Sequence, residues 1–374
     1  MNMPSIPFRL GLQQRVLPSY RVPFFDSLAA VCRGGLGVFA GQARSGEMIA
    51  AAASLKSAVY FPALNRHILG GPLYLCWQSG FLSWLETWQP EVLIVEANQR
   101  YLLTAAAVRW MHARKRPVIG WGLGAPASPG LLAEGLRQAS SRNFLRQFDA
   151  MLVYSRKGAG EYAALGVDPQ RIFVTPNAMA PKPVLPPPER PAVVEVPTVL
   201  FVGRLQERKR VDLLLRACAD LPESLRPRLW LVGEGPARTE WEALARQVYP
   251  MARFWGACYG SELEQLFSQA DLFALPGTGG LAVQQAMSFA LPVIVAEGDG
   301  TQSDLVRPDN GWSLPPGDPH ALTDALAEAL SDFPRLRRMG AESFRIVSEE
   351  VNTDTMVSVF TKCIAELRTQ AVRI

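Results

Sequence analysis

The segment 201–212 places a glycine and several cations directly after an apolar run. Gly203 ends this run, and a glycine at a strand end lets a ligand come close to the backbone. Arg204 can hold a phosphate through two parallel hydrogen bonds, and Lys209 supplies a point charge nearby. Since cations are disfavoured at a helix N-terminus, their clustering indicates an anionic partner such as a diphosphate. The alternative is that such cations lie on the solvated first turn of a helix, and we favour it for Arg208 and Arg210.

A glycine loop in the segment 275–287 follows a second apolar run and leads into a helical pattern. Such a loop directs unpaired backbone N–H groups at any anion placed before the helix. Turns use glycine constantly, so the signal depends on the position of the loop between a strand and a helix. Gln285 falls two turns into the helix, on a side where it could bond a ribose hydroxyl. An ordinary polar helix residue is the other interpretation of Gln285.

A sheet must position these residues, and the second half of the chain predicts one. Buried strands are predicted at 198–202, 229–232, 271–275 and 292–296. Helical patterns separate them, and Ser261 with Glu264 predicts a capping box that begins one of these helices. The alternation of strands and helices predicts a parallel, doubly wound sheet.

The first half of the chain repeats this pattern less regularly. The predicted strands are 91–95, 117–121 and 150–154, and the predicted helices are 22–33, 101–114 and 156–165. In parallel sheets of this kind, ligands bind beyond the carboxyl ends of the strands. Glu96 follows a strand at that end, so we expect it to contact a bound ligand. A surface carboxylate at a strand end is the alternative.

The proline-rich stretch 181–197 separates the two halves. Proline removes a backbone donor and disfavours helix in the preceding residue, so neither a helix nor a central strand continues here. Consecutive prolines favour a stiff, extended connector. We therefore predict one domain at 1–180, a linker at 181–197 and a second domain at 198–350.

The composition narrows the class of protein and its compartment. The 374 residues are 48% hydrophobic and 19% charged, which is typical of a globular chain long enough for two domains. The net charge of +4 comes without a clustered basic stripe, so we do not expect nucleic acid as a partner. The five scattered cysteines lack metal-ligand spacing, which predicts no metal site and a reducing compartment. We find no signal peptide and no bilayer-spanning apolar stretch, so we expect a cytoplasmic protein.

Taken together and in this order, the motifs resemble the family 4 glycosyltransferases of the GT-B fold, of the bacterial polysaccharide and lipopolysaccharide type. In the first half the resemblance rests on 20–28, 95–98, 120–124 and 171–178. In the second half it rests on Gly203-Arg-Leu with Lys209, 232–236, Ala270-Asp271, Ala286-Met287 and Leu291-Pro-Val. These segments cover most of the chain, and their order is more specific than any one of them.

The resemblance implies an α/β protein with two doubly wound parallel-sheet, Rossmann-like domains facing across a cleft. The first would bind the acceptor and the second the donor, and a last helix at 351–374 would pack back on the first. The resemblance also implies that Arg204 and Lys209 grip the donor diphosphate. With Glu96, which we expect to touch the acceptor or the donor sugar, they form our predicted catalytic set. The implied donor-binding residues are Gly203, Arg204, Lys209, Glu234, Gly256, Ala257, Cys258, Thr278, Gly279, Gly280, Leu281 and Gln285.

The implied activity is retaining, metal-independent hexosyl transfer in polysaccharide or glycoconjugate biosynthesis. The donor would be a UDP- or GDP-sugar, with UDP favoured, the acceptor a glycan or lipid-linked glycan, and no further cofactor is expected. The departing phosphate oxygen can accept the acceptor's proton, so catalysis rests on placement and on stabilising the leaving group. The chain holds Gly277 and Gln285 where the family commonly has two glutamates, and Leu123 where it commonly has histidine. These departures keep open a catalytically degenerate GT-B protein that binds a sugar nucleotide or partners another transferase.

Residues 131–148 mix leucine and phenylalanine with arginine. This mixture suits an interfacial helix attracted to anionic lipid, which would give a peripheral position on the cytoplasmic face of the inner membrane. An ordinary amphipathic helix of the first domain is the alternative. We expect His67 to lie in a variable loop on the acceptor side, where it could contact substrate.

Overall fold

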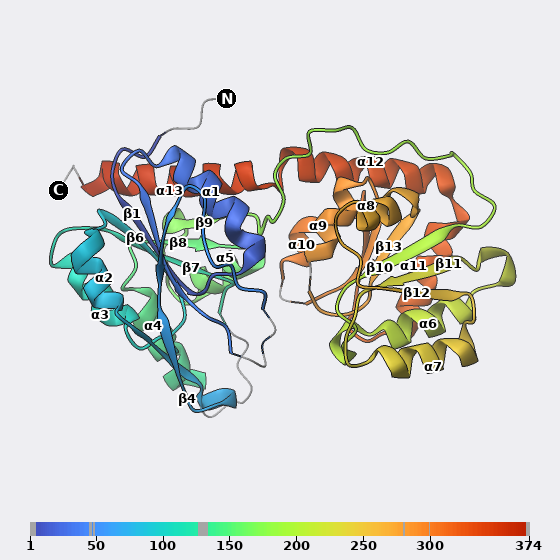
Figure 1. Ribbon diagram of the computed structural model, residues 1–374, viewed down its shortest axis with the longest axis horizontal. Helices are drawn as coiled ribbons and strands as arrows, with labels where there is room; N and C mark the ends of the chain where they lie inside the picture. Colours follow the sequence, from blue (N-terminus) through green and yellow to red (C-terminus); the bar gives the residue numbers. More distant parts are fainter. Residues whose placement is uncertain are drawn as a thin grey trace. The chain divides into compact units, whose positions relative to one another are not determined.

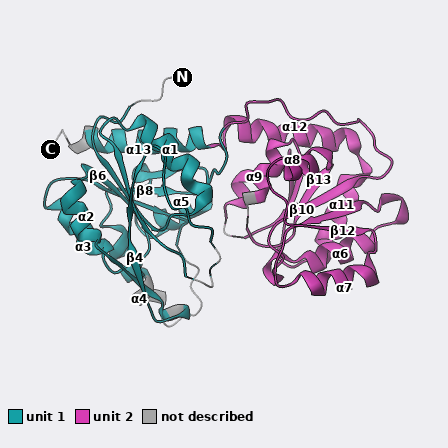
Figure 2. Ribbon diagram, viewed as in Figure 1, with its two compact units in different colours: residues 1–181, 353–374 teal, residues 182–352 magenta. Residues whose placement is uncertain are grey.

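The computed structural model describes residues 5–44, 47, 49–125, 134–279, 281–298 and 300–371. Its contacts divide the chain into two compact units (Figure 2). Unit 1 comprises Met1–Pro181 and Thr353–Ile374, and unit 2 comprises Lys182–Asn352. In each unit, helices cover both faces of a parallel sheet (Figure 1).

Unit 1 contains a seven-stranded sheet of order β3-β2-β1-β6-β7-β8-β9, in which all neighbours are parallel. Its strands are β1 (Leu10–Val16), β2 (Leu36–Gly41), β3 (Val59–Pro62), β6 (Val92–Glu96), β7 (Val118–Gly122), β8 (Ala150–Val153) and β9 (Ile172–Val174). Because both faces are covered, β2 and β8 are buried along their whole length. A separate antiparallel hairpin is formed by β4 (Leu64–Ile68) and β5 (Leu75–Ser79).

Two groups of helices cover the faces of this sheet. On one face pack α1 (Val22–Val31) and α13 (Thr353–Ala371), and on the other α2 (Phe81–Trp88) and α3 (Thr104–His112). The unit also contains α4 (Glu134–Leu145), α5 (Arg156–Ala164), and the short helices η1 (Ser19–Arg21), η2 (Gly71–Leu73) and η3 (Pro169–Arg171). The last helix of the chain buries Met356, Phe360, Cys363 and Ile364 in the core of unit 1, as its apolar periodicity predicts.

Unit 2 contains a six-stranded sheet of order β12-β11-β10-β13-β14-β15, again with all neighbours parallel. Its strands are β10 (Thr198–Val202), β11 (Arg228–Val232), β12 (Ala252–Gly256), β13 (Leu272–Leu275), β14 (Val293–Ala296) and β15 (Gly311–Leu314). Its helices are α6 (Val211–Asp220), α7 (Arg238–Val248), α8 (Gly260–Gln269), α9 (Leu281–Ser288), α10 (Gln302–Leu305), α11 (Pro319–Ser331) and α12 (Phe333–Glu349), with the short η4 (Glu207–Lys209) and η5 (Glu223–Leu225). One contiguous apolar core fills this unit.

Both sheets are doubly wound, which confirms the predicted fold class. The strand order reverses between β1 and β6 in unit 1 and between β10 and β13 in unit 2. In open α/β sheets, ligands bind at such a reversal, beyond the carboxyl ends of the strands. The topology therefore selects two places for functional residues, one in each unit.

Several elements differ from the sequence-based predictions. The strand β1 was missed because Gln13 and Gln14 interrupt its apolar run. The predicted capping box is wrong: α8 begins at Gly260 after Tyr259, and no side chain caps it. His67 lies in the strand β4 rather than in a loop. Among the described residues, no helix is both long and apolar enough to cross a bilayer.

Candidate functional site

The reversal of strand order in unit 2 brings together the two segments that carry the predicted donor chemistry. Gly203 follows β10, and its N–H donates to the Val232 carbonyl at the end of β11, at 3.0 Å. Arg204 comes next and is half-buried. Both residues thus leave the sheet at its carboxyl edge, which is where the sequence predicts a phosphate.

The short helix η4 holds the glycine loop that follows β13. The Thr278 N–H donates to the Arg208 carbonyl at 3.0 Å, and the Lys209 ammonium donates to the Thr278 carbonyl at 2.6 Å. Burial, followed by the charge of Arg208, lowers the pKa of Lys209 to about 8. The ammonium therefore stays charged at neutral pH while being poorly solvated, a state in which a bound anion would be favourable.

Gly277 explains in steric terms why the glycine loop can lie against η4. A Cβ added to Gly277 would lie 2.2 Å from the Arg208 carbonyl oxygen and 2.5 Å from backbone atoms of Lys209. A glutamate at this position would push the loop away from the short helix. This close backbone packing therefore explains why position 277 holds glycine rather than the first glutamate common in the family.

Gly279 lies beside the Lys209 ammonium and has a φ of 109°, in the range that favours glycine. Gly280 lies outside the described residues. Leu281 is the first residue of α9, and Gln285 lies half-buried in the second turn of that helix. The predicted order of strand, glycine loop and helix is therefore present.

The other predicted donor-binding residues lie around the ends of β11 and β12. Glu234 is exposed and forms an ion pair with Arg238, and its carbonyl accepts a hydrogen bond from the Leu205 N–H at 2.9 Å. The Gly256 carbonyl accepts from the Gly233 N–H at 2.7 Å. Ala257 is exposed after it, while the Cys258 thiol is buried, 3.9 Å from two backbone carbonyls of its own loop. Backbone packing, rather than the Cys258 side chain, shapes this edge.

Glu96 lies at the corresponding reversal in unit 1, at the end of β6. Its carboxylate accepts the backbone N–H of Arg15 at 3.1 Å and a hydrogen bond from Tyr101, and its own N–H donates to the Gln13 side chain. Burial raises the pKa of this carboxyl despite these hydrogen bonds. The side chain is half-buried and hydrogen-bonded rather than fully solvated.

The inner face of the β4–β5 hairpin extends this polar cluster. The Gln78 amide bonds the Gln13 side chain, the Gln14 carbonyl and the Asn65 side chain. A second network joins Arg15 to Glu47 at 2.8 Å and Glu47 to Arg44 at 3.0 Å. Burial raises the pKa of Glu47, but the two arginines outweigh it and lower the value to about 2.

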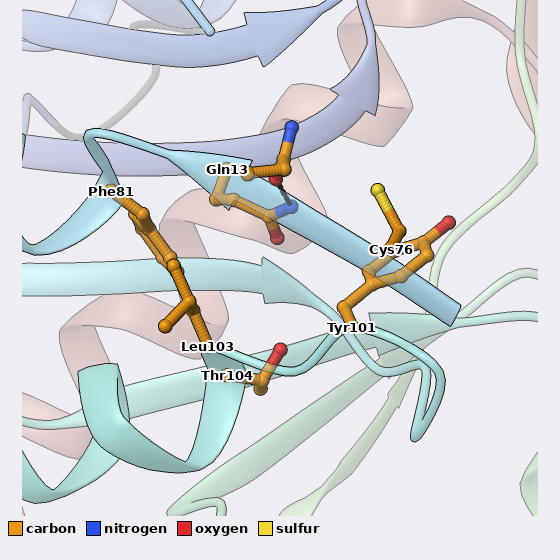
Figure 3. Close-up of a pocket in the computed structure, with 7 residues that line it drawn as sticks. Gln13, Cys76, Phe81, Tyr101, Leu103 and Thr104 are labelled. Atoms are coloured by element: carbon orange, nitrogen blue, oxygen red, sulfur yellow. Dashed lines mark hydrogen bonds between the residues drawn. The ribbon is translucent and has the colours of Figure 1, made fainter. Parts of the chain in front are cut away.

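A small pocket opens within this cluster (Figure 3). It is lined by Gln13, Cys76, Gln78, Phe81, Tyr101, Leu103 and Thr104, and the gap between them, part of it open to solvent, measures about 170 Å³. The Thr104 hydroxyl is buried there without a hydrogen-bond partner among the described residues. The side chains leave essentially no free volume for a water molecule there, so this is a packed crevice rather than a site for a whole sugar.

Sequence reasoning missed the partners of Glu96. Gln13, Arg15, Gln78 and Tyr101 come from three separate segments, and only the fold brings them together. The available signal was the pair Gln13-Gln14 near the end of an apolar run, because buried glutamines need partners. In unit 2, the predicted Arg204, Lys209 and Gly279 do lie at one sheet edge.

Two family models match successive parts of the chain. The model described as "Glycosyl transferase 4-like domain" matches residues 37–178, and "Glycosyl transferases group 1" matches residues 196–332. Together they cover about three quarters of the sequence, one in each unit.

Curated relatives match parts of the chain at moderate identity. A GDP-mannose-dependent alpha-mannosyltransferase of Mycobacterium tuberculosis is 35% identical over 165 residues, which are 41% of each protein. A D-inositol 3-phosphate glycosyltransferase of Xylanimonas cellulosilytica is 27% identical over 288 residues, 71% of this chain and 64% of the relative. The chain thus spans less than two thirds of the length of these relatives.

Solved structures share the fold over nearly the whole chain. The Anabaena protein Alr3699/HepE in complex with UDP has a TM-score of 0.69 at 17% identity, covering 96% of this chain and 100% of that one. The lipopolysaccharide outer core galactosyltransferase WaaB has a TM-score of 0.68 at 17% identity, covering 96% and 99%. At such low identity these likenesses concern the fold alone. With both domain models matched in order on two doubly wound sheets, the chain belongs to the family 4 glycosyltransferases of the GT-B fold.

Proposed function

We propose that the protein transfers a sugar from a nucleotide sugar, a UDP- or GDP-sugar, to a glycan or a lipid-linked glycan. The observation that carries this proposal is the contact between η4 and the glycine loop, where the Lys209 ammonium lies 2.6 Å from the Thr278 carbonyl. This contact keeps the Lys209 ammonium and the backbone of the glycine loop at the carboxyl edge of the sheet, beside Arg204. Such an edge suits a diphosphate.

The relatives support a nucleotide sugar as the donor. One is named as dependent on GDP-mannose, and the Anabaena structures contain UDP and UDP-glucose. We favour UDP for this chain and place the nucleobase near Gly256, Ala257 and Cys258. The ribose would lie near Gln285, whose amide can both donate and accept.

We propose a retaining transfer in which no metal ion takes part. The bond between the anomeric carbon and the diphosphate oxygen breaks, and a bond to the acceptor oxygen forms on the same face. The acceptor's proton passes to the departing phosphate oxygen, while Arg204 and Lys209 stabilise the negative charge that develops there. Glu96, at the end of β6, would hold a sugar hydroxyl rather than act as the base.

Calorimetric titration with UDP, GDP, ADP and their sugar conjugates, each in EDTA and in Mg²⁺, tests the donor site. We expect selective binding that does not require Mg²⁺ and that Arg204→Ala weakens at least about tenfold, as for a lost hydrogen bond to a charged group. Arg228→Ala is the matched control, because this exposed arginine begins β11 at the opposite edge of the same sheet. Equal loss in both variants, or no binding by the unaltered protein, would contradict the assigned site.

The degenerate alternative needs a separate measurement of turnover. A protein that only binds sugar nucleotides would show affinity for them, yet neither transfer nor slow hydrolysis of the donor. Release of UDP or GDP from the preferred donor, with and without a panel of glycans, distinguishes the two hypotheses. The anomeric configuration of any product, read by NMR, tests retention.

A further inference from the structure

The β4–β5 hairpin carries its polar face inward and its apolar face outward. Directly opposed residues of an antiparallel pair share a face, and successive residues alternate between faces. The opposed pairs Asn65–Gln78 and His67–Cys76 therefore share one face, and Gln78 joins it to the polar cluster of unit 1. The pairs Arg66–Trp77 and Ile68–Leu75 form the other face.

The outer face and the tip of the hairpin expose a row of large apolar side chains. We call this row the apolar ridge: Leu64, Ile68, Leu69, Leu73 and Trp77, each between 41% and 71% exposed. An antiparallel sheet with one solvated face normally presents polar residues to water, and here the order is reversed. Contiguous exposed apolar surface of this kind marks an interaction site.

The tip of the hairpin stands clear of the rest of the described chain. The short helix η2 forms the turn, and a Cβ built on Gly70 or Gly71 would meet no atom within 4 Å. Figure 1 shows the β4 end of unit 1 at the lower margin of that unit. The ridge is therefore a protrusion, a shape suited to insertion.

The charges around the ridge are mostly positive. Arg66 lies opposite Trp77 in the middle of the outer face and has no ion-pair partner among the described residues. Arg100 is exposed beside β5, where its carbonyl accepts the Cys76 N–H at 2.8 Å. Of the acids near the hairpin, Glu47 is held by two arginines, and Glu96 is hydrogen-bonded to the Arg15 backbone and to Tyr101.

We propose that the apolar ridge docks the protein on a membrane surface that contains anionic lipid. Leucine and isoleucine would enter the acyl boundary, Trp77 would occupy the interface, and Arg66 would reach the lipid phosphates. The excess of cations selects an anionic lipid surface over a neutral one. If the proposed transfer is correct, this docking brings the Glu96 side of unit 1 close to a lipid-linked acceptor.

A fluorophore at the tip tests the insertion directly. The five native cysteines are all buried, so Leu73→Cys can be labelled selectively with an environment-sensitive dye. We expect a blue shift on phosphatidylcholine vesicles that contain phosphatidylglycerol. Val184→Cys, in an exposed apolar position of unit 2, is the matched control and should show no shift.

Vesicle flotation of unlabelled variants measures the energetic contribution of the ridge. Trp77→Ala with Leu73→Ser should lower the affinity for anionic vesicles at least about tenfold, since two large apolar groups no longer leave water. Arg66→Ala should lower it about fivefold and leave any binding to neutral vesicles unchanged. Val184→Ser with Leu185→Ser, which removes even more exposed apolar groups elsewhere, should have no effect.

Three outcomes would overturn the docking proposal. The first is no binding of the unaltered protein to anionic vesicles at low salt. The second is full binding by the ridge variants, which would direct attention to another surface such as α4. The third is concentration-dependent self-association that the ridge variants abolish. Nucleotide titration of each variant separates this failure from a failure of the proposed transfer, because soluble nucleotides do not need the ridge.

Discussion

The strand order reverses between β1 and β6 in unit 1 and between β10 and β13 in unit 2, but different groups occupy the two reversals. In unit 2 the reversal holds backbone groups, glycines and cations, with Lys209 against the Thr278 carbonyl. In unit 1 it holds neutral amides and a half-buried carboxyl, with Gln13 and Gln78 around Glu96. The same topology thus suits a diphosphate in one unit and hydroxyl groups in the other.

The difference follows from what each ligand requires of its binding site. A diphosphate needs charge and close approach, which cations and a loop without side chains supply. A sugar hydroxyl needs paired donors and acceptors, which amides and a carboxyl group supply. The predictions below test this division, beginning with the largest expected effect.

Gly277→Ala should disrupt the unit 2 reversal. Its Cβ would lie 2.2 Å from the Arg208 carbonyl, so the glycine loop must leave η4 and Lys209 loses its partner. We expect a loss of unfolding free energy on the order of 1–3 kcal/mol and at least about tenfold weaker nucleotide binding. Urea unfolding and calorimetry measure the two effects.

Gly160→Ala is the matched control for this substitution, because a Cβ there meets no atom within 4 Å in the helix α5. It should preserve or slightly raise stability, by about 0.5–1 kcal/mol. A Gly277→Ala variant with unchanged nucleotide affinity would show that the contact between the loop and η4 does not shape the donor site.

The pH dependence of nucleotide binding should report the charge of Lys209. Its pKa of about 8 means that the free protein loses this charge as pH rises through 8. A bound anion favours the charged form, so affinity should fall by up to about tenfold per pH unit above pH 8, with proton uptake on binding. Lys209→Arg should remove most of this decline between pH 7.5 and 9.5, since a guanidinium stays charged. Equal slopes in both proteins would exclude Lys209 as the source.

The stability of unit 1 should depend on pH through Glu96. Burial raises the pKa of this carboxyl above its ordinary value of 4.5. Its contribution to stability is therefore complete below pH 4.5 and is lost as pH rises through the folded-state pKa. The free energy of unfolding of the Glu96→Gln variant, measured in urea, should not show this decline between pH 4 and 8. Glu366→Gln, which alters an exposed carboxylate of the same unit, should follow the unaltered protein.

Substitutions at Gln285 should give the smallest effect and test the ribose contact. Gln285→Ala should weaken nucleotide binding about fivefold, as for one neutral hydrogen bond. Gln285→Glu, which restores the family residue, should stay within about threefold of the unaltered protein, because a carboxylate can still accept from a hydroxyl. If Gln285→Ala binds nucleotide as tightly as the unaltered protein does, Gln285 does not reach the ribose.

Much of unit 2 could be predicted from the sequence. Its core strands are continuous apolar runs, and β10 spans the predicted residues 198–202. Arg204, Lys209 and Gly279 follow such strands directly, so their position at the carboxyl edge needs only the rule for parallel sheets. The reach of Lys209 to the Thr278 carbonyl, 69 residues along the chain, was not predictable, since it depends on how two loops fold against each other.

Much less of the unit 1 cluster could be predicted. Gln13 and Gln14 hid the strand β1, because amide side chains break the apolar pattern that marks a buried strand. Glu96 bonds Arg15, which lies 81 positions away in the sequence, and Gln13, which lies 83 positions away. These partners share no sequence motif. The reversed polarity of the β4–β5 hairpin was equally hidden, because alternation shows two faces without showing which of them turns inward.

The sequence by itself determined the two parallel sheets, the proline-rich break between them and the cationic, glycine-rich edge of the second sheet. These features are local: they follow from periodicity, proline stereochemistry and residues that directly follow strands. Only the tertiary structure decided that Glu96 is half-buried among amides, that Gly277 packs on the backbone of η4 and that the hairpin exposes its apolar face. Each of these depends on contacts between distant segments, and burial and pKa values arise from such contacts alone.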